Sequence, residues 1–344
     1  MYVLDDLTTS VHTPRMDLSG KKVAITGAGG FIGRHLVRRL SEEGAHVTGI
    51  DLKGVKPETG KRVQWIESDL SDEAALKKQL SDCDLVYHLA FPVSDWEKEE
   101  VFVAALKASD LICKICSEKG IRLVLTTSVV VYGDMIGKGP IDESTAHGKP
   151  TGFYTEYKQK QEENAIGHMH RSGADIRIVR PANVYGAGSK PWVNEVVKVL
   201  RQGLPALIGD GKGRAGLIHV LNLVEILILV ARDDDSKGEI FLASDDNHVA
   251  WHTYFSDLAH LANANAPGSM PRFASEMLAV AGETAWKTFG LKGRPPLTRQ
   301  ALMLIGADND FMNTKVKEKL GFAPVITYTQ AMAEIGDYLK TTDL

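Results

Sequence analysis

The chain has 344 residues, of which 44% are hydrophobic and 24% are charged, and its formal net charge is −4. These values are typical of a globular protein with a sizeable core, and they give no reason to expect nucleic acid or an anionic membrane as a partner. With three cysteines and no apolar run long enough to span a membrane, the chain is expected to be cytoplasmic and to lack a disulfide framework.

The chain opens with a polar segment, residues 1–20, which we expect to form a loose tail. From residue 21 onward, short apolar runs alternate with stretches of helical periodicity, which indicates parallel β–α–β units. Asp72 stands where a helix should begin, and Gly44 and Gly120 stand where helices should end. The predicted strands are residues 23–26, 46–50, 63–67, 85–89, 123–127 and 176–180, and the predicted helices are residues 31–43, 72–80, 97–119 and 154–172.

Beyond Pro181 the pattern changes to short strands and helices separated by Gly and Pro. We therefore expect an α/β protein with a Rossmann-type, doubly wound parallel sheet and a small C-terminal substrate-binding cap. In this interpretation residues 21–181 form the nucleotide-binding core. Residues 182–344 mainly form the cap, and a segment at about 215–245 returns to the core.

The run T-G-A-G-G-F-I-G, residues 26–33, connects the first predicted strand to the first predicted helix. Gly27 permits a tight turn, Gly30 lets the backbone approach a pyrophosphate, and Gly33 lets the helix pack on the strand. The amides at the start of the helix are free to bind phosphate oxygens. In this context the motif predicts a dinucleotide site, and the alternative is a glycine-rich turn without a ligand.

Asp51 ends the second predicted strand. A carboxylate there can accept hydrogen bonds from the ribose hydroxyls of an adenosine and would repel a 2′-phosphate, which favours NAD over NADP. Arg34, Lys53 and Lys56 are close in sequence, and a cation facing the same ribose would offset that repulsion, so NADP remains an alternative. Asp69, after the third predicted strand, either lies beside the adenine amino group or closes an ordinary turn.

Cys113 and Cys116 form a C-x-x-C pair inside a helical pattern. A metal site would need further ligands nearby, and the sequence offers none. We therefore expect two buried thiols and no metal.

Tyr154 and Lys158 are four residues apart in a predicted helix, so their side chains share a face. An ammonium group beside a tyrosine lowers the pKa of the phenol from about 10, which prepares it to exchange a proton near neutral pH. Tyr157 competes for this role, but four residues later the chain has Gln161 instead of a lysine. Ser128 follows the fifth predicted strand, at the sheet edge where doubly wound proteins bind ligands. Taken singly, Tyr154 and Lys158 could be exposed side chains on a helix surface, and Ser128 could be a hydroxyl that caps the end of a strand.

Six segments of the chain carry a resemblance to a known family, and they occur in that family's order. They are TGAGGFIG (26–33), DL (69–70), HLA (88–90), TSVVVYG (127–133), YTEYK (154–158) and RPANVYG (180–186). Together they resemble an extended short-chain dehydrogenase/reductase of the NAD-dependent epimerase/dehydratase superfamily, nearest its 3β-hydroxysteroid dehydrogenase-like branch. The resemblance covers residues 21–232 and continues more faintly through residues 315–324.

The resemblance implies a catalytic triad, in which Tyr154 exchanges the substrate proton, Lys158 binds the nicotinamide ribose and Ser128 hydrogen-bonds the substrate oxygen. It also implies a homodimer joined through the helix at 97–119, although packing on the sheet would explain part of that apolar face. The implied NAD-binding residues are Gly27, Gly30, Phe31, Ile32, Gly33, Asp51, Asp69, Leu70, Leu89, Ala90, Thr126, Tyr154, Lys158, Pro181 and Asn183.

Three features narrow the branch that the chain resembles. Val129 and Val130 stand where the dehydratases carry an acidic pair, so sugar dehydration is not expected. Arg214 is one residue further from His219 than the epimerase spacing, which weakens the case for a nucleotide diphosphate clamp. The Asn-x-x-Gly-Thr run that many members carry is A-L-K-A-S at residues 105–109, so an asparagine with a structural or proton-relay role is missing.

These inferences predict an NAD-dependent oxidoreductase that interconverts a secondary alcohol and a ketone on a small or hydrophobic molecule, such as a steroid-like, β-keto acyl or phenylpropanoid compound. The alternatives are an NAD-dependent nucleotide-sugar epimerase and a non-catalytic NAD-sensing regulator, whose usual sign is loss of the Tyr/Lys pair. Several large side chains flank the expected crevice and belong either to an apolar substrate pocket or to the core. They are Trp96, Met135, Phe153, Tyr185 and Trp192.

Overall fold

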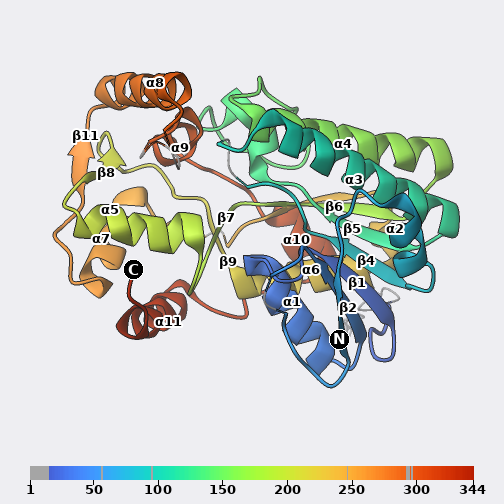
Figure 1. The fold of residues 1–344 in the computed structure, drawn as a ribbon. Helices are drawn as coiled ribbons and strands as arrows, with labels where there is room; N and C mark the ends of the chain where they lie inside the picture. Colours follow the sequence, from blue (N-terminus) through green and yellow to red (C-terminus); the bar gives the residue numbers. More distant parts are fainter. Residues whose placement is uncertain (1–14, 56, 94–95, 246, 292–294, 296) are drawn as a thin grey trace, which may run out of the picture.

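A computed structural model describes residues 15–344, apart from residues 56, 94–95, 246, 292–294 and 296 (Figure 1). The described chain forms a parallel sheet with helices on both faces, at the right of Figure 1, and a smaller part at its left. This is the expected α/β architecture with a C-terminal cap.

The first half of the chain supplies most of the sheet. Its elements are β1 (Lys22–Thr26), α1 (Phe31–Glu42), β2 (His46–Asp51), β3 (Val63–Glu67), α2 (Glu73–Leu80), β4 (Leu85–His88), α3 (Glu99–Lys119), β5 (Arg122–Thr126), η1 (Val129–Met135), α4 (Phe153–Ser172) and β6 (Ile176–Pro181). Every strand and helix predicted here is present, with ends that differ by at most two residues. The local signals act as expected, since Asp72 accepts a hydrogen bond from the amide of Ala75 at 3.0 Å and Gly120 ends α3 with a φ of 67°.

The second half contains shorter elements. They are β7 (Asn183–Tyr185), η2 (Lys190–Asn194), α5 (Glu195–Arg201), β8 (Pro205–Ile208), β9 (Leu217–His219), α6 (Val220–Arg232), η3 (Asp234–Ser236), β10 (Ile240–Ala243), α7 (Trp251–Leu261), β11 (Gly268–Met270), α8 (Arg272–Phe289), α9 (Arg299–Ile305), α10 (Thr314–Leu320) and α11 (Tyr328–Thr341).

The main sheet has seven strands in the order β10-β6-β5-β4-β1-β2-β3, and every neighbouring pair is parallel. Helices α1, α6 and α10 share an apolar cluster with one face of the sheet, and α2, α3 and α4 share another with the opposite face. The chain leaves β1 in one direction through β2 and returns on the other side at β4. In doubly wound proteins, ligands bind at the carboxyl ends of the strands beside this reversal, so the site is expected between β1 and β4.

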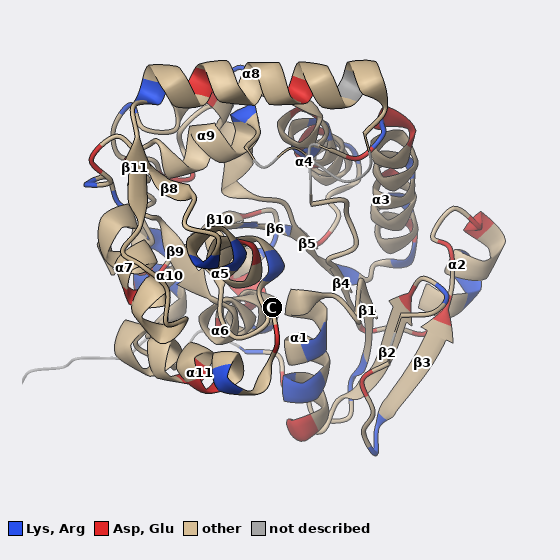
Figure 2. Ribbon diagram, turned by 60° about the vertical axis from the view of Figure 1, so that its left-hand side comes forward, with Lys and Arg blue, Asp and Glu red and all other residues tan. Residues whose placement is uncertain are grey.

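The cap has its own apolar core, in which α5, α7 and α11 pack around Tyr185 and Trp251. Helices α8 and α9 pack around Ala279 and Leu302, and in Figure 2 α8 runs along the top of the molecule above α9. Two small sheets, β11-β8 and β7-β9, complete this half. None of the helices in the described ranges has both the length and the apolar character that a membrane span requires.

The chain passes between core and cap more than once. The segment from α6 to β10 lies in the core, where α6 packs on the sheet and β10 adds the last strand beside β6. Phe311 and α10 form a second return, because they pack into the apolar cluster shared by α1 and α6. The sequence predicts this second segment to lie in the cap, and that prediction is wrong for α10, because a short apolar pattern does not determine which core an element joins.

Residues 15–20 belong to the predicted loose tail, but they lie against the core. Leu18 is fully buried, the amide of Met16 donates to the carbonyl of Arg232 at 2.7 Å, and the backbone of Arg15 pairs with that of Asp233 in an isolated antiparallel β-bridge. The prediction is wrong for these residues because the apolar side chain of Leu18 packs into the cluster that α1 and α6 share with the sheet. Residues 1–14 of the predicted tail lie outside the described residues.

The cysteine prediction is confirmed for the thiols of α3. Cys113 and Cys116 are free and 1% exposed, and burial raises the pKa of the Cys113 thiol to about 12. Among the described residues, no group of three or more His, Cys, Asp or Glu side chains has the arrangement of a metal site.

Candidate active site

The glycines of the predicted dinucleotide motif lie in the loop from β1 to α1. Gly27 has a φ of +72°, and a Cβ there would lie 2.8 Å from the backbone nitrogen of Ala90. A Cβ on Gly33 would overlap the carbonyl oxygen of Gly27, so α1 packs this closely on the loop only because Gly33 lacks a side chain. The amide of Gly30 closes the turn by donating a hydrogen bond to the carbonyl of Gly27 at 3.1 Å. This backbone cradle fits a dinucleotide phosphate pair.

The remaining walls of the crevice come from the start of α1 and the end of β4. Phe31 and Ile32 form the first turn of α1, where backbone amides have no acceptor within the helix. Leu89 and Ala90 follow β4, and the amide of Leu89 donates to the carbonyl of Thr26 at 3.1 Å. The structure therefore brings the glycine loop, the helix start and the segment after β4 to one edge of the sheet.

Asp51 lies beside the glycine loop at the end of β2. Its carboxylate accepts hydrogen bonds at 2.8 Å from the amide of Gly29 and at 2.8 Å from the amide that follows Asp51. Arg34 donates to the carbonyl of Gly29 at 3.0 Å, so a carboxylate and a cation flank the same residue. Lys53 is exposed, and Lys56 lies outside the described residues.

Asp69 lies at the same sheet edge, because the amide of Ser68 donates to the carbonyl of Asp51 at 2.9 Å. The carboxylate of Asp69 accepts from the amide of Ser71 at 3.0 Å, which is the ordinary turn role named as the alternative. Leu70 is half-buried against the cluster of α2 and α3. Asp69 is thus an exposed acid in a turn, and Leu70 contributes apolar surface next to it.

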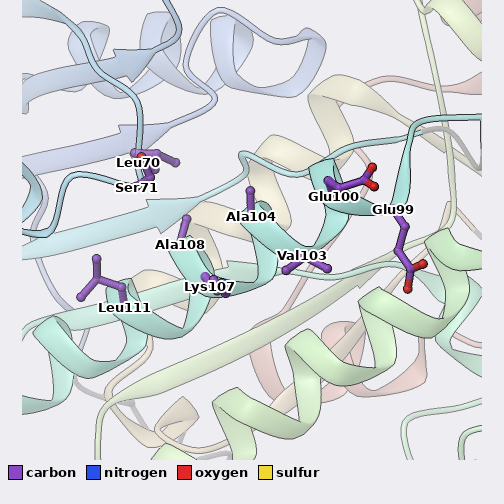
Figure 3. A pocket seen from close by; sticks show the side chains of 9 residues that line it. All are labelled: Leu70, Ser71, Glu99, Glu100, Val103, Ala104, Lys107, Ala108 and Leu111. Atoms are coloured by element: carbon purple, nitrogen blue, oxygen red, sulfur yellow. The ribbon is translucent and has the colours of Figure 1, made fainter.

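A cavity of about 530 Å³ lies on the outer face of α3, where the loop after β3 approaches the helix (Figure 3). None of the predicted catalytic residues lines it. The cavity therefore lies apart from the triad. Its lining residues are Leu70, Ser71, Glu99, Glu100, Val103, Ala104, Lys107, Ala108 and Leu111.

The ends of β4 and β5 carry buried polar atoms that no described residue satisfies. Nδ1 of His88 lies 2.6 Å from the hydroxyl of Thr26, while Nε2 of His88 and the hydroxyl of Thr126 have no hydrogen-bond partner. Burial and the nearby Lys158 lower the pKa of His88 to about 3, so the ring is neutral at ordinary pH. Buried polar atoms left unpaired mark places where a ligand or water completes the hydrogen bonding, which fits a cofactor at this edge.

The three predicted catalytic residues come from adjacent elements. Lys158 is buried on α4, and its ammonium donates to the carbonyl of Thr126, the last residue of β5, at 3.1 Å. Ser128 follows two residues later and caps η1, with its hydroxyl 3.3 Å from the amide of Val130. Tyr154 lies one turn before Lys158 on α4 and packs partly buried against the core cluster. The junction of β5, η1 and α4 therefore carries all three.

Tyr157, the competing tyrosine, faces a different neighbour. Its hydroxyl donates to the carboxylate of Glu99 at 2.9 Å, and its ring stacks on Phe102 with centroids 5.5 Å apart. Burial and the hydrogen bond to Glu99 raise the pKa of Tyr157. A phenol held protonated at the α3–α4 contact is poorly suited to exchange a proton with a substrate.

The environment of Lys158 lowers its proton affinity. The side chain is 3% exposed, and its ammonium lies 4.1 Å from the ring centroid of Phe91. Burial lowers the pKa of Lys158 to about 7, and the carboxylate of Glu162 opposes the shift. The charge of this lysine is therefore sensitive to its few polar contacts.

A buried ionic network, not identified from the sequence, fixes α4 on the sheet. Glu162 is fully buried and forms an ion pair with Arg180 of β6, and it also accepts hydrogen bonds from Thr127 at 3.0 Å and His147 at 2.8 Å. Although burial raises it, the hydrogen bonds from His147 and Arg180 lower the pKa of Glu162 to about 2. The available signal was a glutamate one turn after Lys158 and an arginine near the carboxyl end of β6.

The segment after β6 is held by its own backbone and by Asn183. The amide of Ala182 donates to the carbonyl of Ala243 at 2.9 Å, and the side chain of Asn183 donates to the carbonyl of Ala215 at 2.7 Å. Pro181 ends β6, whose neighbour β5 leads to Ser128. Asn183 therefore anchors this segment to the β9 side through its side chain.

Arg214 is neutralised within the cap. Its guanidinium makes two hydrogen bonds to Asp308, at 2.8 and 2.6 Å, and lies 2.6 Å from a carboxylate oxygen of Asp310. A cation matched by two carboxylates is a poor ligand for a further anion. Val129 and Val130 are 1% and 3% exposed and belong to the core, as expected for residues without acid–base chemistry.

The large side chains around the expected crevice divide between core and surface. Tyr185 is fully buried in the cap core, and Trp192 packs on Trp251 with ring centroids 5.5 Å apart. Tyr185 is thus a core residue, which was the alternative given for it, and Trp192 is half-buried against the cap core. The others are half-buried or exposed, namely Trp96, Met135 and Phe153.

Comparison with known sequences places these motifs in a family. The sequence model described as "NAD dependent epimerase/dehydratase family" matches residues 23–243. The 3beta-hydroxysteroid-dehydrogenase/decarboxylase isoform 1 of Arabidopsis thaliana is 26% identical over 332 residues, which cover 88% of this chain and 76% of that protein. The mouse sterol-4-alpha-carboxylate 3-dehydrogenase, decarboxylating, is 26% identical over 337 residues, 94% of this chain and 92% of that protein.

Solved structures share the fold at low sequence identity. An epimerase from Methanothermobacter thermautotrophicus has a TM-score of 0.75 and 18% identity, over 94% of this chain and 93% of that one. MoeE5, solved in complex with UDP-glucuronic acid and NAD, has a TM-score of 0.72 and 23% identity, over 93% and 99% of the two chains. The common architecture extends over core and cap.

Proposed function

The chain belongs to the NAD dependent epimerase/dehydratase family, and we propose that it is an NAD-dependent oxidoreductase that interconverts a secondary alcohol and a ketone on a small or hydrophobic substrate. It is an enzyme of the extended short-chain dehydrogenase/reductase type. The observation that carries the proposal is the buried ammonium of Lys158 at the end of β5, with Tyr154 one turn earlier on the same helix.

The cofactor crevice supports NAD as the bound group. The glycine cradle, the unpaired polar atoms of His88 and Thr126, and the carboxylate of Asp51 lie along the carboxyl edge of the sheet. Bound there, the nicotinamide would supply the hydride acceptor or donor. The residues proposed to hold the cofactor are Gly27, Gly30, Phe31, Ile32, Gly33, Asp51, Asp69, Leu70, Leu89, Ala90, Thr126, Tyr154, Lys158, Pro181 and Asn183.

The chain's own residues manage the proton and the substrate oxygen. In alcohol oxidation, the phenolate of Tyr154 takes the proton from the substrate hydroxyl, and in ketone reduction the phenol returns it. The positive charge of Lys158 favours the phenolate, because an opposite charge nearby lowers the pKa of an acid. The hydroxyl of Ser128 donates a hydrogen bond to the substrate oxygen and holds it beside the phenol.

Arg214 supports a substrate without a diphosphate. A nucleotide-sugar epimerase needs cations for the diphosphate of its substrate, and Arg214 is already paired with Asp308 and Asp310. Two of the relatives reported above are named as dehydrogenases of a hydroxysteroid and of a sterol carboxylate. We therefore assign the substrate to hydrophobic hydroxy or keto compounds ahead of nucleotide sugars.

A substrate panel tests this proposal. The protein is incubated with NAD⁺ and secondary alcohols, including 3β-hydroxysteroids and hydroxyacyl esters, and in parallel with UDP-sugars. Steady production of NADH from an alcohol is the expected result. Turnover of a UDP-sugar without net NADH would instead establish the epimerase, and NAD binding without any turnover across the panel would favour the non-catalytic regulator.

The homodimer remains a proposal based on the family resemblance. Ile112 and Ile115 of α3 are buried, whereas Val101 is 43% exposed and Ala104 is also exposed. The outer face of α3 therefore retains apolar surface for a second copy. Light scattering of the purified protein tests this, and a monomeric mass would contradict it.

A further inference from the structure

The ammonium of Lys158 has a second acceptor besides the strand end. It donates to Oε1 of Gln161, three residues later on α4, at 3.0 Å. Both side chains are buried, Lys158 at 3% and Gln161 at 1% exposure. A buried ammonium depends on such contacts, because no solvent replaces a lost acceptor.

Gln161 is itself held by a different helix. Its Nε2 donates at 3.0 Å to the hydroxyl of Ser109 on α3, and Ser109 is 1% exposed. An ammonium group only donates hydrogen bonds, whereas an amide has a donor end and an acceptor end. The serine therefore fixes the amide with its oxygen towards the lysine. This chain of contacts runs from α3 through Gln161 to Lys158.

We propose that Gln161, braced by Ser109, is a positioning residue that holds the ammonium of Lys158 charged and in place at the end of β5. This inference rests on the proposed function for its meaning in catalysis. It assigns a role to Gln161 on α4 and to Ser109 on α3, neither of which the sequence predicted as a site residue. It also supplies a polar link from α3, the helix on which the chain has Ala105 instead of the family's asparagine.

The groups around Lys158 leave this task to an uncharged acceptor. Glu162 is one turn away on the same helix, but its carboxylate is taken by Arg180 of β6 and by His147. His88 of β4 is buried and neutral, and Thr126 contributes only its carbonyl. From α3, Ser109 is linked to the lysine through Gln161. The amide oxygen of Gln161 thus accepts from Lys158 and, unlike the carboxylate of Glu162, is not paired with an arginine.

Titration of Lys158 in the ligand-free protein tests the proposal directly. Lysines are labelled with ¹³C at Cε, the Lys158 signal is assigned by its loss in Lys158→Met, and its pKa is followed by NMR. Gln161→Leu removes the acceptor and keeps the bulk, so the pKa of Lys158 should fall by about one unit or more. Gln161→Glu restores an acceptor with a negative charge, so the pKa should rise above that of the wild type.

Two further variants keep the test decisive. Ser109→Ala leaves the amide but removes its brace, and it should lower the pKa of Lys158 by a smaller amount, even where Gln161→Leu does not fold. Gln159→Leu is the matched control, because Gln159 is also buried on α4 but donates to the carbonyls of Val131 and Gly148. This control should leave the titration of Lys158 unmoved.

The catalytic consequence is measured as a pH profile. With Lys158 less charged, the phenol of Tyr154 ionises at higher pH, so the rising limb of alcohol oxidation should move up by about one pH unit in Gln161→Leu. An unchanged pKa of Lys158 in both Gln161→Leu and Ser109→Ala would overturn the role of Gln161, whatever the enzyme turns over. Failure of the substrate panel would overturn the proposed function and leave the NMR result standing.

Discussion

Two consecutive turns of α4 bury charge in different ways. The first carries Lys158, which is surrounded by a carbonyl, an amide and an aromatic ring, and burial lowers its pKa to about 7. The second carries Glu162, whose carboxylate faces Arg180 and His147, and its pKa falls to about 2 despite burial. Equal burial thus produces a charge that can be lost near neutral pH in one turn and a permanent charge in the next.

The two buried charges differ in whether an opposite charge compensates them. A buried charge with an ionic partner is fixed, and it secures the packing of α4 on β6. A buried charge with only neutral partners has a proton affinity that depends on each contact, which suits a residue beside a reacting phenol. On neighbouring turns of one helix, Glu162 therefore stabilises the packing and Lys158 is suited to the proposed reaction.

The largest effect on stability is expected from breaking the compensated pair. Glu162→Leu leaves the guanidinium of Arg180 buried without its partner, and the free energy of unfolding should fall by about 3–5 kcal/mol. Urea denaturation measures this. The double variant Glu162→Leu/Arg180→Met removes both charges and should recover most of the loss. Equal stability of the wild type and the single variant would mean that the pair does not secure α4.

Removing the phenol of Tyr154, one turn before Lys158, should affect turnover and leave stability nearly unchanged. In Tyr154→Phe, kcat should fall by about two orders of magnitude, because a positioned acid–base group is lost. NAD binding, followed by calorimetry, should remain nearly intact. Tyr157→Phe is the same chemical change three residues later and should keep most of the turnover. Near-normal turnover of Tyr154→Phe would remove this tyrosine from its proposed role.

The uncompensated lysine should appear in the pH dependence of stability. Its pKa is about 7 in the folded protein and about 10.4 in an unfolded chain, so the unfolded state binds more protons between these values. The free energy of unfolding should therefore gain up to about 1.4 kcal/mol per pH unit from this group as the pH rises from about 7 towards 10. Lys158→Met should lack this gain. Parallel stability curves for the two proteins would show that Lys158 is not depressed.

Asp51 extends the comparison to a carboxylate that accepts hydrogen bonds from two backbone amides. The smallest effect is expected here, because Asp51→Ala removes a ribose acceptor at the rim of the crevice. The variant should bind NAD about tenfold more weakly and should discriminate less against NADP. Dissociation constants for both cofactors measure this. An unchanged preference would mean that another group contacts the ribose.

The local part of this protein was predictable from its sequence. Alternating apolar runs and turn residues predicted each strand and α-helix of the first half, though not the short helix η1, and Asp72 and Gly120 act as the caps that their side chains and backbone favour. The tight turn at Gly27 and the packing at Gly33 also follow from short-range sterics. Such features depend on a few neighbouring residues, so a sequence pattern contains nearly all of the relevant physics.

Contacts between distant residues were not predictable in the same way. The pairing of Arg214 with Asp308 joins residues 94 positions apart, and the contact of Gln161 with Ser109 joins residues 52 apart. The burial of Leu18 and the return of α10 to the core likewise depend on which elements pack together. The hydrophobic repeat of a single helix or strand predicts none of these contacts.

The order and type of the elements, the glycine cradle and the shared helical face of Tyr154 and Lys158 are thus properties of the chain as written. Which charges are compensated was decided by the tertiary structure: Glu162 received a guanidinium, Lys158 an amide, and Arg214 two carboxylates. The physical reason is that the proton affinity of a buried group is set by the few atoms that packing places around it, and those atoms come from elements far away in the sequence.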